Sequence, residues 1–284
     1  KVDQSLLQTL MRRMDSIRTK DLPMNQQSLA EYLYRRKWFN PFPKFKFTER
    51  PDTAAACILE GKIIILVDNS PTAMILPTSI FDVIEEANDY YFPTLTGCYL
   101  RIVRHIVFWA TMILTPLWYL LLLYESVLPQ WLSFVIPKEP GLLPIIIQLF
   151  LTEFVLDGLK LASLNTPSVL SNSLSVVGGL LLGDFAIQVG WLCPDVILYM
   201  AFVSIANFTQ SSYELGYAFK YMRMITLFLT AVLKIWGFFI GIILTLVLIG
   251  SNESLNYKKT YLYPLIPFNK KALLRLFFRL KKND

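Results

Sequence analysis

Three ionisable residues lie inside an apolar stretch that is long enough to cross a lipid bilayer. Glu153, Asp157 and Lys160 fall within residues 142–163, whose other side chains are mostly Leu, Ile, Phe and Val. At about 100° per residue, the three side chains share an arc of about 60° on a helix. An ionisable group at the centre of a bilayer costs at least ~2.5–3.5 kcal/mol, so it normally faces water or a charged partner. The spacing therefore predicts one polar wall of an ion pathway.

Two interpretations of this polar arc stay open. In the first, the three side chains from several copies form charged rings around a water-filled axis, and the excess of acidic groups favours cations. In the second, Asp157 and Lys160 neutralise each other within the helix, and Glu153 pairs with Arg223 or Lys234 inside the helix bundle.

A fourth candidate, Asp184, lies in an apolar segment that is crowded with small and polar residues. Residues 168–190 hold several serines and glycines after the helix-breaking Asn165-Thr166-Pro167. Such a sequence is typical of a broken or re-entrant helix whose free backbone groups line a cavity. Close packing of helices through small residues explains it equally well. Asp184 is accordingly either a pore residue or a polar packing group.

Composition and charge favour a membrane protein without catalytic chemistry. Apolar residues make up 54% of the chain and charged residues 17%. The net charge of +6 comes from residues 251–284, which hold eight Lys or Arg against two Asp or Glu, and no nucleic-acid motif accompanies it. His105 is the only histidine and the three cysteines have no paired spacing. We therefore expect no metal site, no cofactor, no enzyme activity and no nucleic-acid partner.

The apolar segments predict an α-helical integral membrane protein with about four net crossings and a broken or re-entrant segment. The basic regions at both ends belong in the cytoplasm by the positive-inside rule, so the number of crossings must be even. A version with six crossings, in which residues 209–234 form a separate span, stays open. The four expected crossings are residues 106–124, 142–164, one net crossing from 168–208, and 224–249.

Basic residues are expected to anchor the chain at the membrane surface. Arg101 and Arg104 precede the first span, where they fit lipid headgroups better than a gating role. Near the end of the chain, Lys271, Arg275 and Arg279 share one face of a predicted amphipathic helix over residues 270–282. Such a helix binds anionic lipids, although a solvated tail is the simpler alternative.

The polar part of the chain divides into two predicted regions before the membrane domain at 102–250 and the basic tail at 251–284. Residues 1–46 are expected to be a basic segment with a short helix and a linker rich in proline and aromatic residues, left from an amino-terminal subdomain that this fragment lacks. Residues 47–101 predict a small α/β cytoplasmic domain, with strands at 62–67 and 72–76.

A turn and a helix start support this prediction. Asp68-Asn69-Ser70-Pro71 is a turn sequence between the two strands. Ser79, with Asp82 three residues later, predicts the first turn of a helix. We find no phosphate-binding glycine loop in this region.

Several short motifs resemble the A-subunit family of bacterial spore germination receptors, the GerA family. In the polar region these are Thr48–Asp52 (TERPD), Leu59–Lys62 (LEGK), Val67–Pro71 (VDNSP), Leu76–Thr78 (LPT), Tyr90-Tyr91 and Tyr99–Arg101 (YLR). In the apolar region they are Glu153-Phe154 with Asp157-Gly158, Asn165–Pro167, Gly178-Gly179 with Leu182-Gly183, Tyr199–Ala201, and Tyr261–Asn269 (YLYPLIPFN). The resemblance covers about residues 40–280 and is closest to the stage V sporulation protein AF branch.

This resemblance implies a multi-pass protein of the spore inner membrane that forms an oligomer, such as a ring, and takes part in ion release during germination. Its expected partners are further copies of itself, other germination proteins of that membrane, anionic lipids and permeant monovalent cations. A non-conducting scaffold that gathers other germination proteins is the alternative function.

Overall fold

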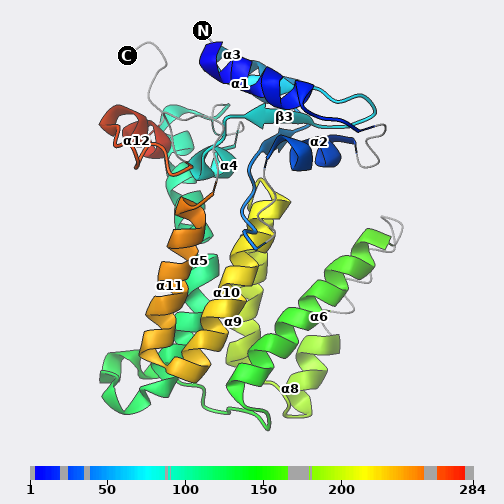
Figure 1. The fold of residues 1–284 in the computed structure, drawn as a ribbon. Helices are drawn as coiled ribbons and strands as arrows, with labels where there is room; N and C mark the ends of the chain where they lie inside the picture. Colours follow the sequence, from blue (N-terminus) through cyan, green and yellow to red (C-terminus); the bar gives the residue numbers. More distant parts are fainter. Residues whose placement is uncertain are drawn as a thin grey trace. The chain divides into compact units, whose positions relative to one another are not determined.

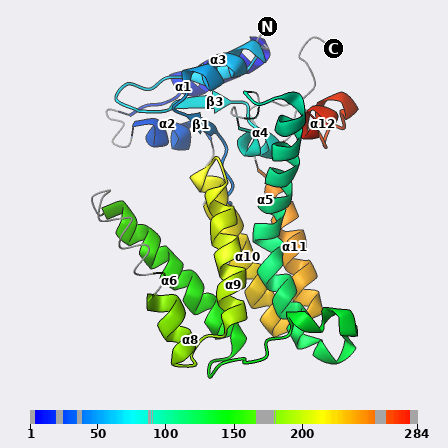
Figure 2. The same cartoon turned by 180° about the vertical axis from the view of Figure 1, so that it is seen from behind.

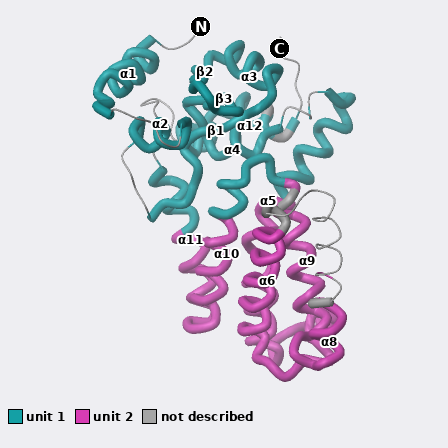
Figure 3. The backbone as a smooth tube through the Cα atoms, turned by 90° about the vertical axis from the view of Figure 1, so that its right-hand side faces the viewer, with its two compact units in different colours: residues 1–106, 210–218, 245–284 teal, residues 107–209, 219–244 magenta. Residues whose placement is uncertain are grey.

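The computed structural model divides the chain into two compact units (Figure 3). Unit 1 comprises residues 1–106, 210–218 and 245–284, and unit 2 comprises residues 107–209 and 219–244. The structure describes residues 4–19, 25–34, 39–86, 89, 91–165, 179, 181–252 and 261–278.

Unit 1 is built on a small antiparallel sheet of three strands, in the order β1-β3-β2 (Figure 2). The strands are β1 (Lys46–Thr48), β2 (Ile63–Ile65) and β3 (Ala73–Leu76). Ile64 pairs with Ile75, and Phe47 pairs with Met74. The two predicted strands therefore exist in shorter form as β2 and β3. The third strand, β1, comes from a segment that the sequence analysis left unassigned.

Two amino-terminal helices complete the core of unit 1. They are α1 (Gln4–Asp15) and α2 (Asn25–Leu33). Leu10 and Leu33, each 2% exposed, belong to the same core cluster as Met74 and Leu76 of β3. The short helix predicted within residues 1–46 is therefore present as α1. Apolar side chains at helical spacing bury this segment against the sheet, as the burial of Leu6 beside Leu10 illustrates.

A capping box fixes the short helix that follows the sheet. Helix α4 (Ile80–Ile84) begins after Ser79, whose hydroxyl accepts a hydrogen bond from the Asp82 amide, while the Asp82 carboxylate accepts one from the Ser79 amide. This confirms the predicted helix start. Lys62 forms a 2.6 Å ion pair with Asp82, and Lys46 donates 2.7 Å hydrogen bonds to the carbonyl oxygens of Asp82 and Glu85. Two lysines from the sheet strands and their flanks thus hold α4 in place.

Another helix, α3 (Pro51–Leu59), precedes β2, with proline in its first turn and Asp52 near its amino end. Both features favour the start of a helix. At the other end of unit 1, Tyr261 is fully buried and its carbonyl oxygen accepts a 3.0 Å hydrogen bond from the Ile80 amide.

The amphipathic tail helix is present as α12 (Lys270–Phe277), capped by the side chain of Asn269. Lys271 is exposed on it. Arg275 belongs to its backbone, and Arg279 lies outside the described residues.

Helices make up unit 2, and three of them also contribute residues to unit 1 (Figure 1). Among the described residues, α5 is the one helix whose length and hydropathy both suffice to cross a membrane, and α9 and α11 are shorter apolar helices. Pro116 lies within α5. The five longer helices are α5 (Thr94–Leu123), α6 (Ile145–Asn165), α9 (Pro194–Phe208), α10 (Tyr213–Leu233) and α11 (Ile235–Gly250). The short helical segments are η2 (Glu125–Val127), η3 (Gln130–Val135), η4 (Leu181–Phe185) and α8 (Ala186–Gln188).

Residues 213–250 form a helical hairpin rather than one helix over 224–249, which agrees with the alternative that placed a separate helix at 209–234. Helix α10 ends at Leu233, Lys234 adopts a positive φ of 54°, and α11 begins at Ile235. A Cβ atom on Gly237 would lie 1.9 Å from the Leu229 carbonyl oxygen, and one on Gly241 would lie 2.5 Å from the Thr226 hydroxyl. These contacts pair later residues of α11 with earlier residues of α10. The two helices are therefore antiparallel, and the glycines allow their close approach.

The core of unit 2 joins the loop after α5 to α6 and α9. Trp118 donates a 2.9 Å hydrogen bond to the Val135 carbonyl oxygen, and its ring stacks on Tyr199 with centroids 4.5 Å apart. Gln148 is fully buried, donates to the Pro140 carbonyl oxygen and accepts from the Cys193 amide. One side chain of α6 therefore fixes both the preceding loop and the start of α9.

Most of the glycine-rich segment at 168–190 lies outside the described residues. Its described end consists of the π-helical turn η4 and the three-residue helix α8, followed by Gly190 with a positive φ of 78°. A broken or re-entrant helix over this segment stays a prediction.

Candidate functional site

Helices α6 and α10 bring four charged side chains together inside unit 2. Glu153 on α6 accepts a 2.6 Å hydrogen bond from Nη2 of Arg223 on α10. The ammonium of Lys220 lies 3.0 Å from the other oxygen of Glu153 and forms a second ion pair with Asp157. Arg223 also donates a 3.0 Å hydrogen bond to the Thr111 carbonyl oxygen of α5. We call Glu153, Asp157, Lys220 and Arg223 the charge cluster.

Helical spacing explains why these four side chains meet. Glu153 and Asp157 lie four residues apart on α6, and Lys220 and Arg223 lie three residues apart on α10. Residues at these separations occupy the same helix face. Two acidic groups on one helix thus face two basic groups on the other, and the formal charges sum to zero.

The charge cluster is buried at one end and partly exposed at the other. The side chains of Lys220 and Arg223 are 4% exposed and that of Glu153 is 8% exposed, whereas that of Asp157 is 36% exposed. Buried charges need partners because desolvation costs several kcal/mol per ion. Glu153 has two cationic partners, which explains how its carboxylate stays ionised in the interior. Asp157 connects the charge cluster to the surface of the unit.

An aromatic cluster joins α5 to α10 one helical turn before Arg223. Phe219, next to Lys220 in the chain, is 1% exposed and packs on Phe108 with ring centroids 4.1 Å apart. The ring of Trp109 meets Phe219 edge-on at 5.8 Å. Phe219 and Arg223 lie four residues apart on α10 and therefore share one helix face.

The structure separates the predicted site residues into two groups. Glu153 and Asp157 belong to the charge cluster, and Glu153 pairs with Arg223, as the pairing interpretation expected. Asp157 pairs with Lys220, which the sequence analysis had not chosen. Lys160 is half-buried one turn beyond Asp157, and Asp184 is exposed in η4.

Lys234, the other suggested partner of Glu153, is exposed at the tip of the α10–α11 hairpin. The sequence signal for Lys220 and Arg223 was their own spacing. Lys220 was missed because the last span was placed after it, whereas Arg223 was named as a possible partner of Glu153.

The two arginines at the start of α5 are ion-paired within unit 1. Arg101 lies 2.7 Å from Glu85 and is 3% exposed, and Arg104 lies 2.5 Å from the fully buried Asp89 and 3.0 Å from Glu86. Headgroup anchoring by Arg101 and Arg104 stays a prediction, and in the structure both side chains have acidic partners. These pairs hold the segment after α4 against the first turns of α5. A membrane-surface role for Lys271 stays a prediction.

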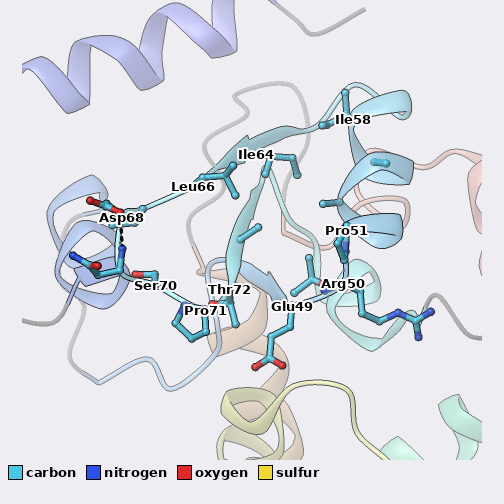
Figure 4. A pocket seen from close by; sticks show the side chains of 16 residues that line it. Glu49, Arg50, Pro51, Ile58, Ile64, Leu66, Asp68, Ser70, Pro71 and Thr72 are labelled. Atoms are coloured by element: carbon cyan, nitrogen blue, oxygen red, sulfur yellow. Dashed lines mark hydrogen bonds between the residues drawn. The ribbon is translucent and has the colours of Figure 1, made fainter.

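Unit 1 also carries an open groove of about 820 Å³ beside the edge strand β2 (Figure 4). Leu66 and Ile58 line it and are 79% and 54% exposed, and Asp68 and Glu49 lie toward its rim. Its lining residues are mainly apolar and include no pair of groups arranged for catalysis. Among the described residues, no group of His, Cys, Asp or Glu is placed to hold a metal ion.

Comparison with known proteins explains the combination of a small polar unit and charged apolar helices. A family model described as Bacillus/Clostridium GerA spore germination protein matches residues 1–284. The chain belongs to the GerA family. Stage V sporulation protein AF of Bacillus subtilis (strain 168) is 36% identical over 280 residues, which cover 99% of this chain and 56% of that protein.

More distant relatives of this GerA-family chain are germination proteins by name. Spore germination protein KA of Bacillus subtilis is 27% identical over 98% of this chain and 51% of its own length, and GerQA of Bacillus cereus is 28% identical over 94% and 53%. The chain spans about half the length of the curated relatives it matches. No solved structure matches it.

Proposed function

We propose that this GerA-family chain is a membrane subunit of a spore germination complex that conducts ions when a dormant spore germinates. One observation carries the proposal. A charge cluster with buried members lies between apolar helices and reaches the surface of unit 2 through Asp157. Ionisable residues within membrane-spanning segments characteristically mark ion pathways and face a bundle interior or a water-filled cavity.

The charge cluster assigns different roles to the predicted pore residues. Glu153 is neutralised by Arg223 and Lys220, so we assign it to holding α6 against α10. Asp157 is the member of the cluster that water reaches most readily, so we assign it to the ion pathway, with Lys160 one turn further along the same face. Asp157 shares Lys220 with Glu153, so a carboxylate lines the proposed pathway, and we propose a cation as the permeant ion.

Assembly is part of the same proposal. Rings of charge around an axis require several copies, so we propose a homo-oligomer in the spore inner membrane, with the basic ends of the chain on the cytoplasmic side. The names of the relatives support partnership with other germination proteins. No catalytic step is assigned to the chain.

A non-conducting scaffold is the second candidate function. The zero net charge of the cluster favours it, because fully paired charges can serve to fix one helix arrangement. A scaffold of this kind would gather other germination proteins without passing ions itself.

The test measures ion currents from the complete protein in planar bilayers under a K⁺ gradient. The variants are Asp157→Asn and the matched control Glu125→Gln, which removes an exposed acidic group outside the charge cluster. We expect discrete currents from the unmodified protein, with a changed conductance or reversal potential in Asp157→Asn and unchanged values in Glu125→Gln.

The other outcomes separate the candidates. Currents that are identical in Asp157→Asn would keep conduction and remove Asp157 from the pathway. An oligomeric protein that passes no current, either alone or with its germination partners, would favour the scaffold.

A further inference from the structure

The Lys220 ammonium occupies a position that a permeant cation would take in the proposed pathway. The ammonium lies between carboxylates of two successive turns of α6, 3.0 Å from Glu153 and in contact with Asp157. Carboxylate oxygens arranged around a compact positive charge are also the ligands of a hard metal cation. An ammonium group and K⁺ carry the same charge and are of similar size, so one can take the place of the other.

Removing the Lys220 ammonium would change the net charge of the group around it. Arg223 lies 2.6 Å from Glu153 and balances one of the two acidic groups. Without Lys220, the three side chains of Glu153, Asp157 and Arg223 carry one net negative charge among them, and Lys160, one turn beyond Asp157, is the next charged side chain of α6. A single monovalent cation would restore neutrality there.

The position of the Lys220 ammonium borders the surface of unit 2 at Asp157. Asp157 is 36% exposed, whereas Lys220 beside it is 4% exposed. A cation that arrives at Asp157 therefore meets the lysine ammonium at the first buried position. Because the lysine is tethered to α10, it occupies this position at a very high effective concentration.

We infer that the ammonium of Lys220 is a tethered counter-ion that holds a monovalent-cation site between Glu153 and Asp157, and that permeant cations compete with it for those carboxylates. This inference rests on the proposed conduction function for its biological role. The binding site itself is testable without any current.

The binding test compares thermal unfolding of the complete detergent-solubilised protein in KCl and in N-methylglucamine chloride at equal ionic strength. In Lys220→Gln the vacated site should bind K⁺, so Tm should rise by about 2–4 °C when K⁺ exceeds its dissociation constant about fivefold. The unmodified protein, Lys220→Arg and the exposed control Lys234→Gln should have the same Tm in both salts. The double variant Lys220→Gln/Asp157→Asn should also lose the K⁺ effect.

The other possible results test the cation site and the conduction function separately. Equal Tm values of Lys220→Gln in the two salts would overturn it, and so would a Lys220→Gln protein that fails to fold in both. A Lys220→Gln protein that folds only in K⁺ would support it strongly. K⁺ flux from proteoliposomes then tests the function separately. A K⁺-stabilised variant that passes no ions would retain the site and refute conduction.

Discussion

Individual side chains of the charge cluster depend on one another because most of them are buried. Glu153 has two cationic partners, and Arg223 divides its donors between Glu153 and the Thr111 carbonyl oxygen. Removing one member of such a group leaves a buried charge without compensation, which costs more than the pair itself contributes.

Arg223→Gln is therefore expected to lower the free energy of unfolding by about 3–5 kcal/mol. The double variant Arg223→Gln/Glu153→Gln should lose much less than the sum of the two single changes, because both buried charges disappear together. Denaturant unfolding in detergent measures all three. Additive losses would show that Glu153 and Arg223 do not interact in the folded protein.

A second residue pair predicts how unit 1 responds to pH. Burial by itself would raise the pKa of Asp82, but the Lys62 ammonium and the hydrogen bonds from Ser79 hold that pKa below its usual value of 3.8. Burial would lower the pKa of Lys62, and the Asp82 carboxylate instead raises it above 10.5. The stabilisation is therefore complete between about pH 4 and pH 10.

Asp82→Asn is expected to lower Tm at pH 7, and the difference from the unmodified protein should shrink as pH falls below about 4. The sign follows because a group with a depressed pKa contributes stability above its unfolded pKa and loses it as pH falls through the folded value. Thermal scans between pH 7 and pH 3 measure this, with the exposed Glu49→Gln as control. A constant difference across this range would show that the Asp82 charge plays no part.

Sequence reasoning located half of the charge cluster. Glu153 and Asp157 were identifiable because charge on an apolar helix is costly, and the Ser79–Asp82 cap was identifiable because its signal is local. Lys220 and Arg223 lie more than 60 residues from their partners. Arg223 was one of two suggested partners of Glu153, and only the ion pairs between α6 and α10 show that Lys220 belongs to the same site.

At the scale of elements, the hairpin of α10 and α11 depends on glycine where the two helices touch. A methyl group on Gly237 would collide with the Leu229 carbonyl oxygen at 1.9 Å, whereas one on Gly158 of α6 would meet no atom within 4 Å. The two positions therefore provide a matched comparison of the same substitution in two helices of unit 2.

Gly237→Ala is expected to destabilise the protein by about 1–3 kcal/mol, because the helices must move apart. Gly158→Ala should be neutral or stabilising by up to about 1 kcal/mol, because alanine is the better helix former. Unfolding of both variants in detergent gives the comparison. Equal effects of the two substitutions would contradict the close approach of α10 and α11.

The same hairpin shows why some elements could not be predicted from the sequence. Residues 224–249 are almost uniformly apolar, so their composition cannot distinguish one long helix from two. The turn at Lys234 needs a positive φ, which lysine rarely adopts, and no glycine or asparagine stands there to indicate a turn. Strand β1 was missed because three residues provide too little alternation to recognise.

For the whole molecule, the hairpin changes the number of crossings that the chain needs. If α5, α6, α10 and α11 each cross once, and if both basic ends lie in the cytoplasm, then residues 166–212 must cross an even number of times. If α9 is one of these crossings, a second is required before it. Under these conditions the chain crosses six times, which is the alternative that the sequence analysis left open beside four crossings.

Cysteine labelling of sealed vesicles can test this topology in a variant without the native cysteines. Cysteines at Tyr213 and Ser251 should react from the same side of the membrane, and a cysteine at Lys234 should react from the opposite side. The expected pattern follows from two antiparallel helices joined at residue 234. If the cysteines at Tyr213 and Ser251 are instead labelled from opposite sides, residues 213–251 cross the membrane once, and the chain as a whole crosses it four times.

The distance along the chain between the partners of the charge cluster has a consequence for biosynthesis. Helix α6 emerges from the ribosome carrying Glu153, Asp157 and Lys160, while Lys220 and Arg223 follow more than 60 residues later. At about 5–20 residues per second, α6 waits roughly 3–12 s for its counter-charges. During that interval its charged side chains without their α10 partners oppose its release into lipid. If both helices span the bilayer, we expect the insertion machinery to retain α6 until α10 arrives, so that they enter the bilayer as a neutral pair.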